Sequence, residues 1–362
     1  MAVSRSEIEE RWLGQPLHEN EAETILESFN RVEQILGRAW LEASLAPGIV
    51  GPSVALPIYF LGIQLDVLSG AKGAEKLIQR LQAREPAALS ELHSIALCVG
   101  SNNVELEIEP PATVGDAEKV PDFRLRHPGD EWVWVEVTRP NYSESAQIAQ
   151  KAAASLRDLL AMIPDGMELQ IRFRSEPSDA DLNSVRAEVG HATINQTIDR
   201  PTFIIHTSTA TPVLTPIGDD EQGRPIFGNA VGRVSGENRA LLSVRVPYTD
   251  LRGQQVIDAE ARQLPREGPG LICIATAHGK YWQALIERSF SPTIRRRISG
   301  VLLFQTGLLL GEHGIELQTA GRLLSNLHAR VPLPSWLEAS LHRLPATFRT
   351  AGASKAAETD GG

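Results

Sequence analysis

Residues 120–140 read Val-Pro-Asp-Phe-Arg-Leu-Arg-His-Pro-Gly-Asp-Glu-Trp-Val-Trp-Val-Glu-Val-Thr-Arg-Pro, and the prediction of the fold begins with this segment. Two runs of β-forming residues, 123–126 and 132–138, flank a Pro-Gly-Asp turn, and this pattern predicts a β-hairpin. Side chains alternate along a strand, so Glu136 and Thr138 share one face of the second run with two tryptophans, while three valines share the other. Both faces are largely apolar, which indicates a strand that is covered on both sides.

Two carboxylates belong to this hairpin. Asp122 enters the first strand, and Glu136 lies near the end of the second. A carboxylate in a buried strand needs a partner, because an unpaired buried charge is strongly disfavoured. Two neighbouring carboxylates also repel each other unless a cation lies between them. The pair therefore predicts a site for a divalent metal ion.

The hairpin also resembles a known signature. Pro121-Asp122 at the start of one strand, followed by Glu136-Val137-Thr138 on the next, is similar to the motif of the PD-(D/E)XK nuclease superfamily, which has the restriction-endonuclease-like fold. Thr138 stands where the family usually has Lys. That Lys orients or activates the attacking water and stabilises developing negative charge, so its absence weakens the expectation of an enzyme.

The surrounding elements follow the same order as the family's core. Apolar spacing predicts a helix over 86–99, strict alternation predicts a strand over 104–109, and the hairpin comes next. A second predicted helix covers 143–163, and a further alternating strand covers 167–173. The resemblance thus implies an α/β protein with a restriction-endonuclease-like core of helix, three strands, helix and strand. The expected divisions are an N-terminal helical region at 1–84, the core at 85–175, a C-terminal α/β extension at 176–345 and a disordered tail at 346–362.

The resemblance implies a set of site residues. Asp122, Glu136 and the backbone carbonyl of Val137 would hold Mg²⁺ or Mn²⁺, hard cations that prefer oxygen ligands. Glu91, on the helix before the sheet, would bind directly or through water; the alternative is an ordinary solvated helix residue. Thr138 would hydrogen-bond the attacking water, and Lys151 on the following helix is a candidate replacement for the missing Lys. The alternative for Lys151 is an exposed helix Lys without a role.

A basic segment in the second half is the candidate nucleic-acid contact. Arg295, Arg296 and Arg297 are consecutive, and clustered arginines are the expected footprint of a phosphate backbone. Lys280 stands near Tyr281, whose ring could add a stacking surface. A solvated helix end with arginines near its C-terminus would explain the same cluster without nucleic acid.

Composition limits the classes of protein. The chain has 362 residues, 42% of them hydrophobic and 22% charged, which is typical of a globular protein with a large core. Cys98 and Cys273 are too few and too far apart for a disulfide framework or a zinc finger, and they favour a reducing, cytoplasmic setting. The segment 48–65 is interrupted by prolines and predicts a buried helix rather than a membrane span. No secretory signal pattern opens the sequence.

Two functions from different classes remain open. The first is a metal-dependent nuclease that hydrolyses phosphodiester bonds, in DNA rather than RNA, alone, as a homodimer or with a partner in a restriction or defence system. The second is a catalytically inactive module of the same fold that binds nucleic acid or a protein partner. A third interpretation is an unrelated α/β protein in which Asp122 and Glu136 only fix a turn and a strand end. The sequence has no phosphate-binding glycine loop, dinucleotide fingerprint or His-Glu-x-x-His zinc motif.

Overall fold

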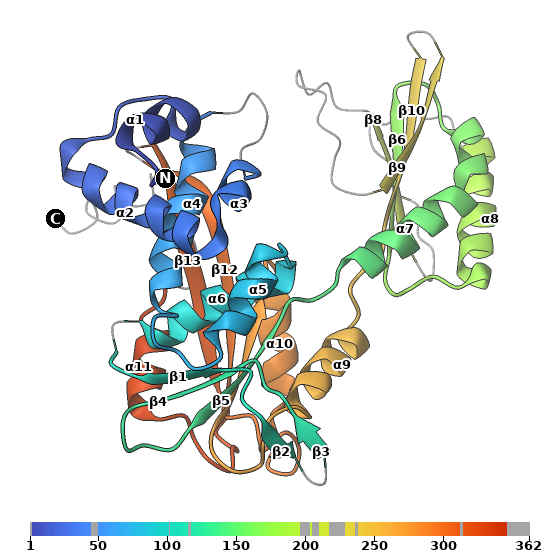
Figure 1. Cartoon of the computed structure of the whole chain (residues 1–362). Coiled ribbons are helices and arrows are strands. Elements are labelled where there is room, and N and C mark those ends of the chain that lie inside the picture. The colour runs from blue at the N-terminus through green and yellow to red at the C-terminus, as the bar shows by residue number, and fades with distance from the viewer. Residues whose placement is uncertain are drawn as a thin grey trace, which may run out of the picture. The chain divides into compact units, whose positions relative to one another are not determined.

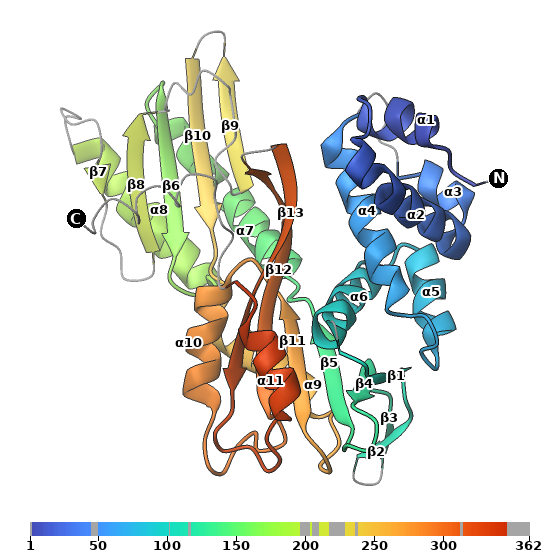
Figure 2. The same ribbon diagram turned by 90° about the vertical axis from the view of Figure 1, so that its left-hand side faces the viewer.

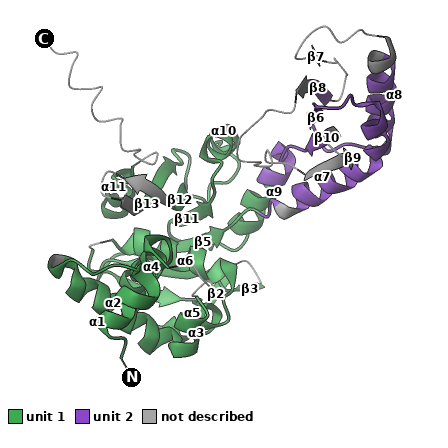
Figure 3. Ribbon diagram, turned by 90° about the horizontal axis from the view of Figure 1, so that it is seen from above, with its two compact units in different colours: residues 1–140, 254–362 green, residues 141–253 purple. Residues whose placement is uncertain are grey.

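The chain divides into two compact units. A computed structural model describes residues 2–44, 50–100, 102–114, 117–195, 203–204, 210–216, 229–235, 238–311 and 314–345. Unit 1 comprises residues 1–140 and 254–362, and unit 2 comprises residues 141–253 (Figure 3). Unit 2 is therefore an insertion between two parts of unit 1 that are distant in sequence.

Unit 1 contains a six-stranded mixed sheet with the order β1-β4-β5-β11-β12-β13 (Figures 1 and 2). Its strands are β1 (Glu105–Ile108), β4 (Phe123–Arg126), β5 (Val133–Thr138), β11 (Gly270–Ala275), β12 (Gly300–Gly311) and β13 (Gly314–Ser325). The predicted hairpin is the antiparallel pair β4–β5, in which Phe123 lies opposite Val135. Strands β5, β11 and β12 run parallel, whereas β13 returns antiparallel to β12. A separate two-stranded ribbon joins β2 (Ala112–Val114) to β3 (Ala117–Lys119).

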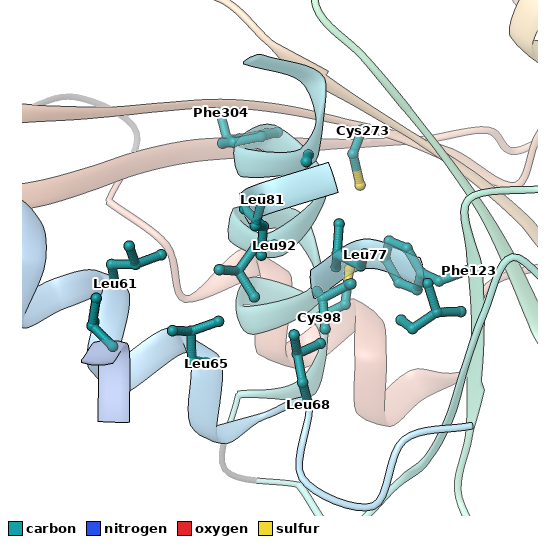
Figure 4. Packing of buried hydrophobic residues seen from close by; sticks show 14 of the residues in the cluster. Leu61, Leu65, Leu68, Leu77, Leu81, Leu92, Cys98, Phe123, Cys273 and Phe304 are labelled. Carbon is teal, nitrogen blue, oxygen red and sulfur yellow. The ribbon is translucent and has the colours of Figure 1, made fainter. Parts of the chain in front are cut away.

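Helices from the N-terminal part cover one face of this sheet. They are α1 (Arg5–Ile8), η1 (Glu9–Leu13), α2 (Glu19–Leu36), α3 (Arg38–Glu42), α4 (Pro52–Asp66), α5 (Ala74–Gln82) and α6 (Pro86–Val99), and α11 (Ser335–His342) joins them. Their apolar side chains form one core with the inward residues of the strands (Figure 4). Leu92 and Cys98 of α6 are fully buried there together with Phe123 of β4 and Cys273 of β11, so both cysteines are core residues, and both are free thiols.

The other face of the sheet carries α9 (Asp250–Ala261) and α10 (Gly279–Ser289). The connection from β5 to β11 ends in α9, and the connection from β11 to β12 contains α10. Crossovers between parallel strands are right-handed, and both advance in the same direction across the sheet, so their helices cover the same face. Trp282 of α10 and Ile257 of α9 are fully buried in this second layer.

Unit 2 has its own sheet and core. The strand order is β7-β8-β6-β10-β9, and the strands are β6 (Met167–Phe173), β7 (Phe203–Ile204), β8 (Ala210–Pro216), β9 (Asn229–Ser235) and β10 (Asn238–Arg245). Its helices are α7 (Ser143–Ser155), η2 (Arg157–Met162) and α8 (Asp179–Asn195). Leu159 of η2, Val185 of α8 and Leu156, which lies between α7 and η2, pack with Leu169 and Ile171 of β6.

The α/β class with a mixed sheet is confirmed, but the predicted core succession needs a correction. The helix at 143–155 and the strand at 167–173 form close to the predicted positions. However, β6 pairs with β8 and β10 in unit 2, whereas the strand beside β5 is β11. The division at residue 175 therefore differs from the observed boundaries, which lie at 140 and 253. The predicted tail at 346–362 lies outside the described residues.

The segment predicted as a buried helix at 48–65 contains α4, whose Ile58, Leu61 and Leu65 are buried. Among the described residues no helix combines the length and the apolar character that a membrane crossing would need.

Candidate functional site

Asp122 lies where β4 separates from β5. The last ladder partners are Phe123 and Val135, after which β5 continues only beside β11. The backbone N–H of Val137, which is left without a β4 partner by this separation, donates a 2.6 Å hydrogen bond to Asp122 Oδ2. The N–H of Glu109 binds the carbonyl oxygen of Asp122 at 2.8 Å. Both the side chain and the backbone of Asp122 are therefore fixed.

Glu136 is buried on β5, next to Asp122. Only 4% of its surface is exposed. The strand alternation turns its side chain to the face covered by α9 and α10, opposite the valines that enter the main core. Its carboxyl group hydrogen-bonds Asp122, yet its Oε1 atom is buried without a hydrogen-bond partner in the described part of the chain. An unsatisfied buried carboxyl oxygen is costly, so it marks a position where a ligand would be favoured.

A third carboxylate, that of Glu260, lies close enough to raise the pKa of both Asp122 and Glu136, and it was not predicted as a site residue. Glu260 lies near the end of α9 and is half-buried. Thr138, two residues after Glu136 on the same face of β5, hydrogen-bonds the Glu260 carboxylate. The only signal in the sequence was a helical pattern over residues 250–264, most of which forms α9. Nothing in the spacing between 136 and 260 indicates that the two glutamates meet.

Glu91 approaches from the opposite layer but is already neutralised. It is buried on α6 and forms a two-pronged ion pair with Arg80 of α5, through a 2.6 Å contact from Nη1 to Oε1 and a second contact from Nη2 to Oε2. Arg80 also lies 3.1 Å from Glu109. The negative charge of Glu91 raises the pKa of Asp122, and the positive charge of Arg80 lowers it. Glu91 thus borders the cluster, with both of its oxygens engaged.

The crowding of these acids changes their protonation. Burial, followed by repulsion from Glu91, raises the pKa of Asp122 to about 7, although the Val137 N–H opposes the shift. Burial, followed by the charges of Asp122 and Glu260, raises the pKa of Glu136 to about 10. Burial also raises the pKa of Glu260, against the hydrogen bond from Thr138. At neutral pH the cluster therefore holds protons that ordinary carboxylates would have released, and a cation could replace them.

The donor set fits a hard divalent cation. Asp122, Glu136 and Glu260 offer only carboxylate oxygens, the ligands that Mg²⁺ and Mn²⁺ prefer. Among the described residues, no group of three or more His, Cys, Asp or Glu side chains is arranged to hold a metal ion. The side chains would have to rotate to bring the three carboxylates around one ion. The unpartnered Oε1 of Glu136 and the mutual repulsion of the acids both favour such a change.

The other predicted site residues have different surroundings. Val137 contributes its N–H to Asp122, a contact that was not predicted for it. Lys151 is an exposed residue of α7 in unit 2. The side chain of Thr138 hydrogen-bonds the Glu260 carboxylate.

The three consecutive arginines are held largely by the protein itself. Arg295 forms an ion pair with Asp258 at 2.9 Å, and Arg297 donates to the carbonyl oxygen of Ala261 at 3.1 Å. These contacts tie the loop before β12 to the end of α9. Arg296 is exposed. Lys280 lies apart from them, at the start of α10.

Comparisons of this chain with protein-family models, with curated proteins and with solved structures found no match.

Proposed function

We propose that unit 1 is a metal-dependent phosphodiesterase that cleaves nucleic acid, with Asp122, Glu136 and Glu260 as the ligands of Mg²⁺ or Mn²⁺. The observation that carries the proposal is the gathering of these three acids beside the buried, unpartnered Oε1 of Glu136. Perturbed carboxylates of this kind are typical of functional sites. DNA is the proposed substrate.

The order of elements in unit 1 supports the resemblance to PD-(D/E)XK nucleases. Helix α6 precedes three antiparallel strands, and after the insertion α9 leads into β11, which is parallel to β5. With α9 and β11 taken as the last two members, this order is similar to the family's succession of helix, three strands, helix and strand. Asp122 directly precedes β4, and Glu136 lies on the neighbouring strand β5, an arrangement similar to that of the motif.

The roles of the residues follow from their contacts. When bound, the metal would lower the pKa of a water molecule and polarise a phosphate oxygen. Asp122 is held in position by the Val137 N–H. Arg80 and Glu91 form an ion pair near Asp122, and their opposite charges have opposing effects on its pKa. Thr138 orients Glu260 but supplies no positive charge, so we expect slower turnover than in a protein with Lys at this position.

Plasmid cleavage tests the proposal. Purified protein is incubated with supercoiled DNA and Mn²⁺ or Mg²⁺, beside Asp122→Asn and Glu136→Gln. Glu131→Gln is the matched control, because Glu131 is an exposed residue of the same hairpin. We expect metal-dependent nicking by the wild type and the control, with a loss of at least about a hundredfold in both site variants. Nicking that persists in the site variants contradicts the proposal.

A second candidate function is a binding module without catalysis. It is favoured by Thr138, which is uncharged and already bound to Glu260. A protein of this kind would retain labelled DNA on a filter and lose it with rising salt, because phosphate contacts are salt-dependent. It would show no cleavage with either metal. Both measurements use the same preparation, so they separate the two functions directly.

A further inference from the structure

A second site lies at the carboxyl ends of the parallel strands of unit 1. A cavity of about 520 Å³ opens beside the end of β11 and the first turn of α10, and its walls include residues from β12 and β13. Its volume falls in the range of pockets that bind small ligands. The acidic cluster does not contribute to its lining.

The cavity combines an apolar floor with a cationic rim. Leu303 and Ala320 are buried and form part of the floor. Lys280 and Arg322 stand at the rim, and both are exposed. Neither side chain has a hydrogen bond or an ion pair with any other residue that the structure describes. The described residues that line the cavity include no Asp or Glu, so the two cations favour an anionic ligand.

The strand register connects this cavity with the acidic cluster. Thr138 of β5 pairs with Ile274 of β11, Ile274 pairs with Leu303 of β12, and Leu303 pairs with Arg322 of β13. Residues paired across neighbouring strands point to the same face of a sheet. Thr138 and Arg322 thus belong to one row on one face, three strand spacings apart, which is about 14 Å.

We propose that this cavity binds a phosphate group of a nucleotide unit, with Lys280 and Arg322 as the phosphate ligands. Arg and Lys are the side chains that bind phosphate most commonly, Arg through its planar fork and Lys as a point charge. Tyr281, half-buried in the same lining, offers a ring against which a base can stack. The phosphate group would belong to the nucleic-acid strand that the acidic cluster would cleave. This assignment of the ligand rests on the proposed function.

Fluorescence anisotropy with EDTA present tests the site independently of any metal. The probes are a short fluorescein-labelled single-stranded DNA and a fluorescent mononucleotide, and inorganic phosphate is the competitor. Lys280→Ala/Arg322→Ala is compared with the charge-preserving Lys280→Arg/Arg322→Lys. The matched control is Arg288→Ala, which removes a cation from the same helix but does not line the cavity.

We expect the wild type to bind the DNA, phosphate to compete, and the double alanine variant to bind about tenfold more weakly or worse. The charge-preserving variant and Arg288→Ala should retain most of the affinity. Binding of the mononucleotide but not of the DNA would support the phosphate site while arguing against the proposed nuclease. If neither probe binds, or if the double alanine variant binds as well as Arg288→Ala, the inference is overturned.

Discussion

Replacing Glu136 by Gln should stabilise the metal-free protein, and the gain should grow with pH. Glu136 is almost fully buried beside Asp122, and its pKa is raised from 4.5 to about 10 by burial and by the neighbouring negative charges. The folded state therefore holds a proton that the unfolded state releases above its ordinary pKa. Stability is then lost progressively as the pH rises from about 4.5 towards 10, because the unfolded state binds fewer protons over this range.

The magnitude follows from the size of the shift. Each pH unit above the ordinary pKa costs the folded state about 1.4 kcal/mol. At pH 8 the proton on Glu136 thus costs at most about 5 kcal/mol, and at pH 5 it costs less than about 1 kcal/mol. Gln has a similar shape and needs no proton, and its amide can donate to Asp122. We expect Glu136→Gln to remove most of this pH-dependent cost.

Urea denaturation in EDTA, followed by tryptophan fluorescence, measures the effect. All six tryptophans of the chain belong to unit 1, so the signal reports the unit that contains the cluster. The difference in unfolding free energy between Glu136→Gln and wild type should be several-fold larger at pH 8 than at pH 5, whereas exposed Glu131→Gln should change little. A variant that is less stable than wild type at pH 8, or equally shifted at both pH values, would refute the reasoning.

Three further predictions concern the surroundings of the cluster. Arg80→Met leaves the buried Glu91 carboxylate unpaired and should destabilise unit 1 by about 3 kcal/mol. The double variant Arg80→Met/Glu91→Gln should recover most of this stability, and a double variant no more stable than Arg80→Met would contradict the prediction. Gly62→Ala should lower the free energy of unfolding by at least about 2 kcal/mol, because a Cβ there would overlap the backbone carbonyl of Ser28. An unchanged midpoint of thermal or urea unfolding would contradict this, since it would show that α2 and α4 can move apart without cost. Thr138→Val removes a hydrogen bond to the Glu260 carboxylate of α9 and should cost about 1–2 kcal/mol. The cost should be larger at high pH than at low pH, because the hydrogen bond favours the ionised carboxylate; a cost independent of pH would rule out this contact.

The hairpin was predictable because its signals are local. The alternation in 132–138 and the turn at 128–130 fix the pairing of β4 with β5, and this pairing brings Asp122 beside Glu136 without any information from the rest of the chain. The convergence of the first two acids therefore follows from the sequence alone.

The remainder of the sheet could not be predicted in this way. Strand 167–173 has the right length and alternation for a core strand, but local periodicity does not state which sheet a strand joins. The parallel partner of β5 is β11, which comes after the whole of unit 2. Parallel pairing has no turn signal, since a long crossover connects the two strands.

The same reason explains the errors at the site. Glu260 meets Thr138 only through the packing of α9 after the insertion, so no spacing rule identifies it. Glu91 was correctly placed on the helix before the sheet, yet its ion pair with Arg80 depends on how α5 packs against α6. Arg295 and Arg297 stand in a basic run, but their partners are residues of α9 that are distant in sequence.

Titration of Mn²⁺ into the protein by calorimetry, in buffers with different ionisation enthalpies, tests the central claim most directly. If Asp122, Glu136 and Glu260 hold a divalent ion, the wild type should bind Mn²⁺ at pH 7 and release protons, since the cluster must lose the protons that burial and repulsion retain. Asp122→Asn and Glu136→Gln should each lose most of the affinity, and Glu131→Gln should bind as the wild type does. Absence of binding by the wild type, or binding that neither site variant weakens, would contradict the account.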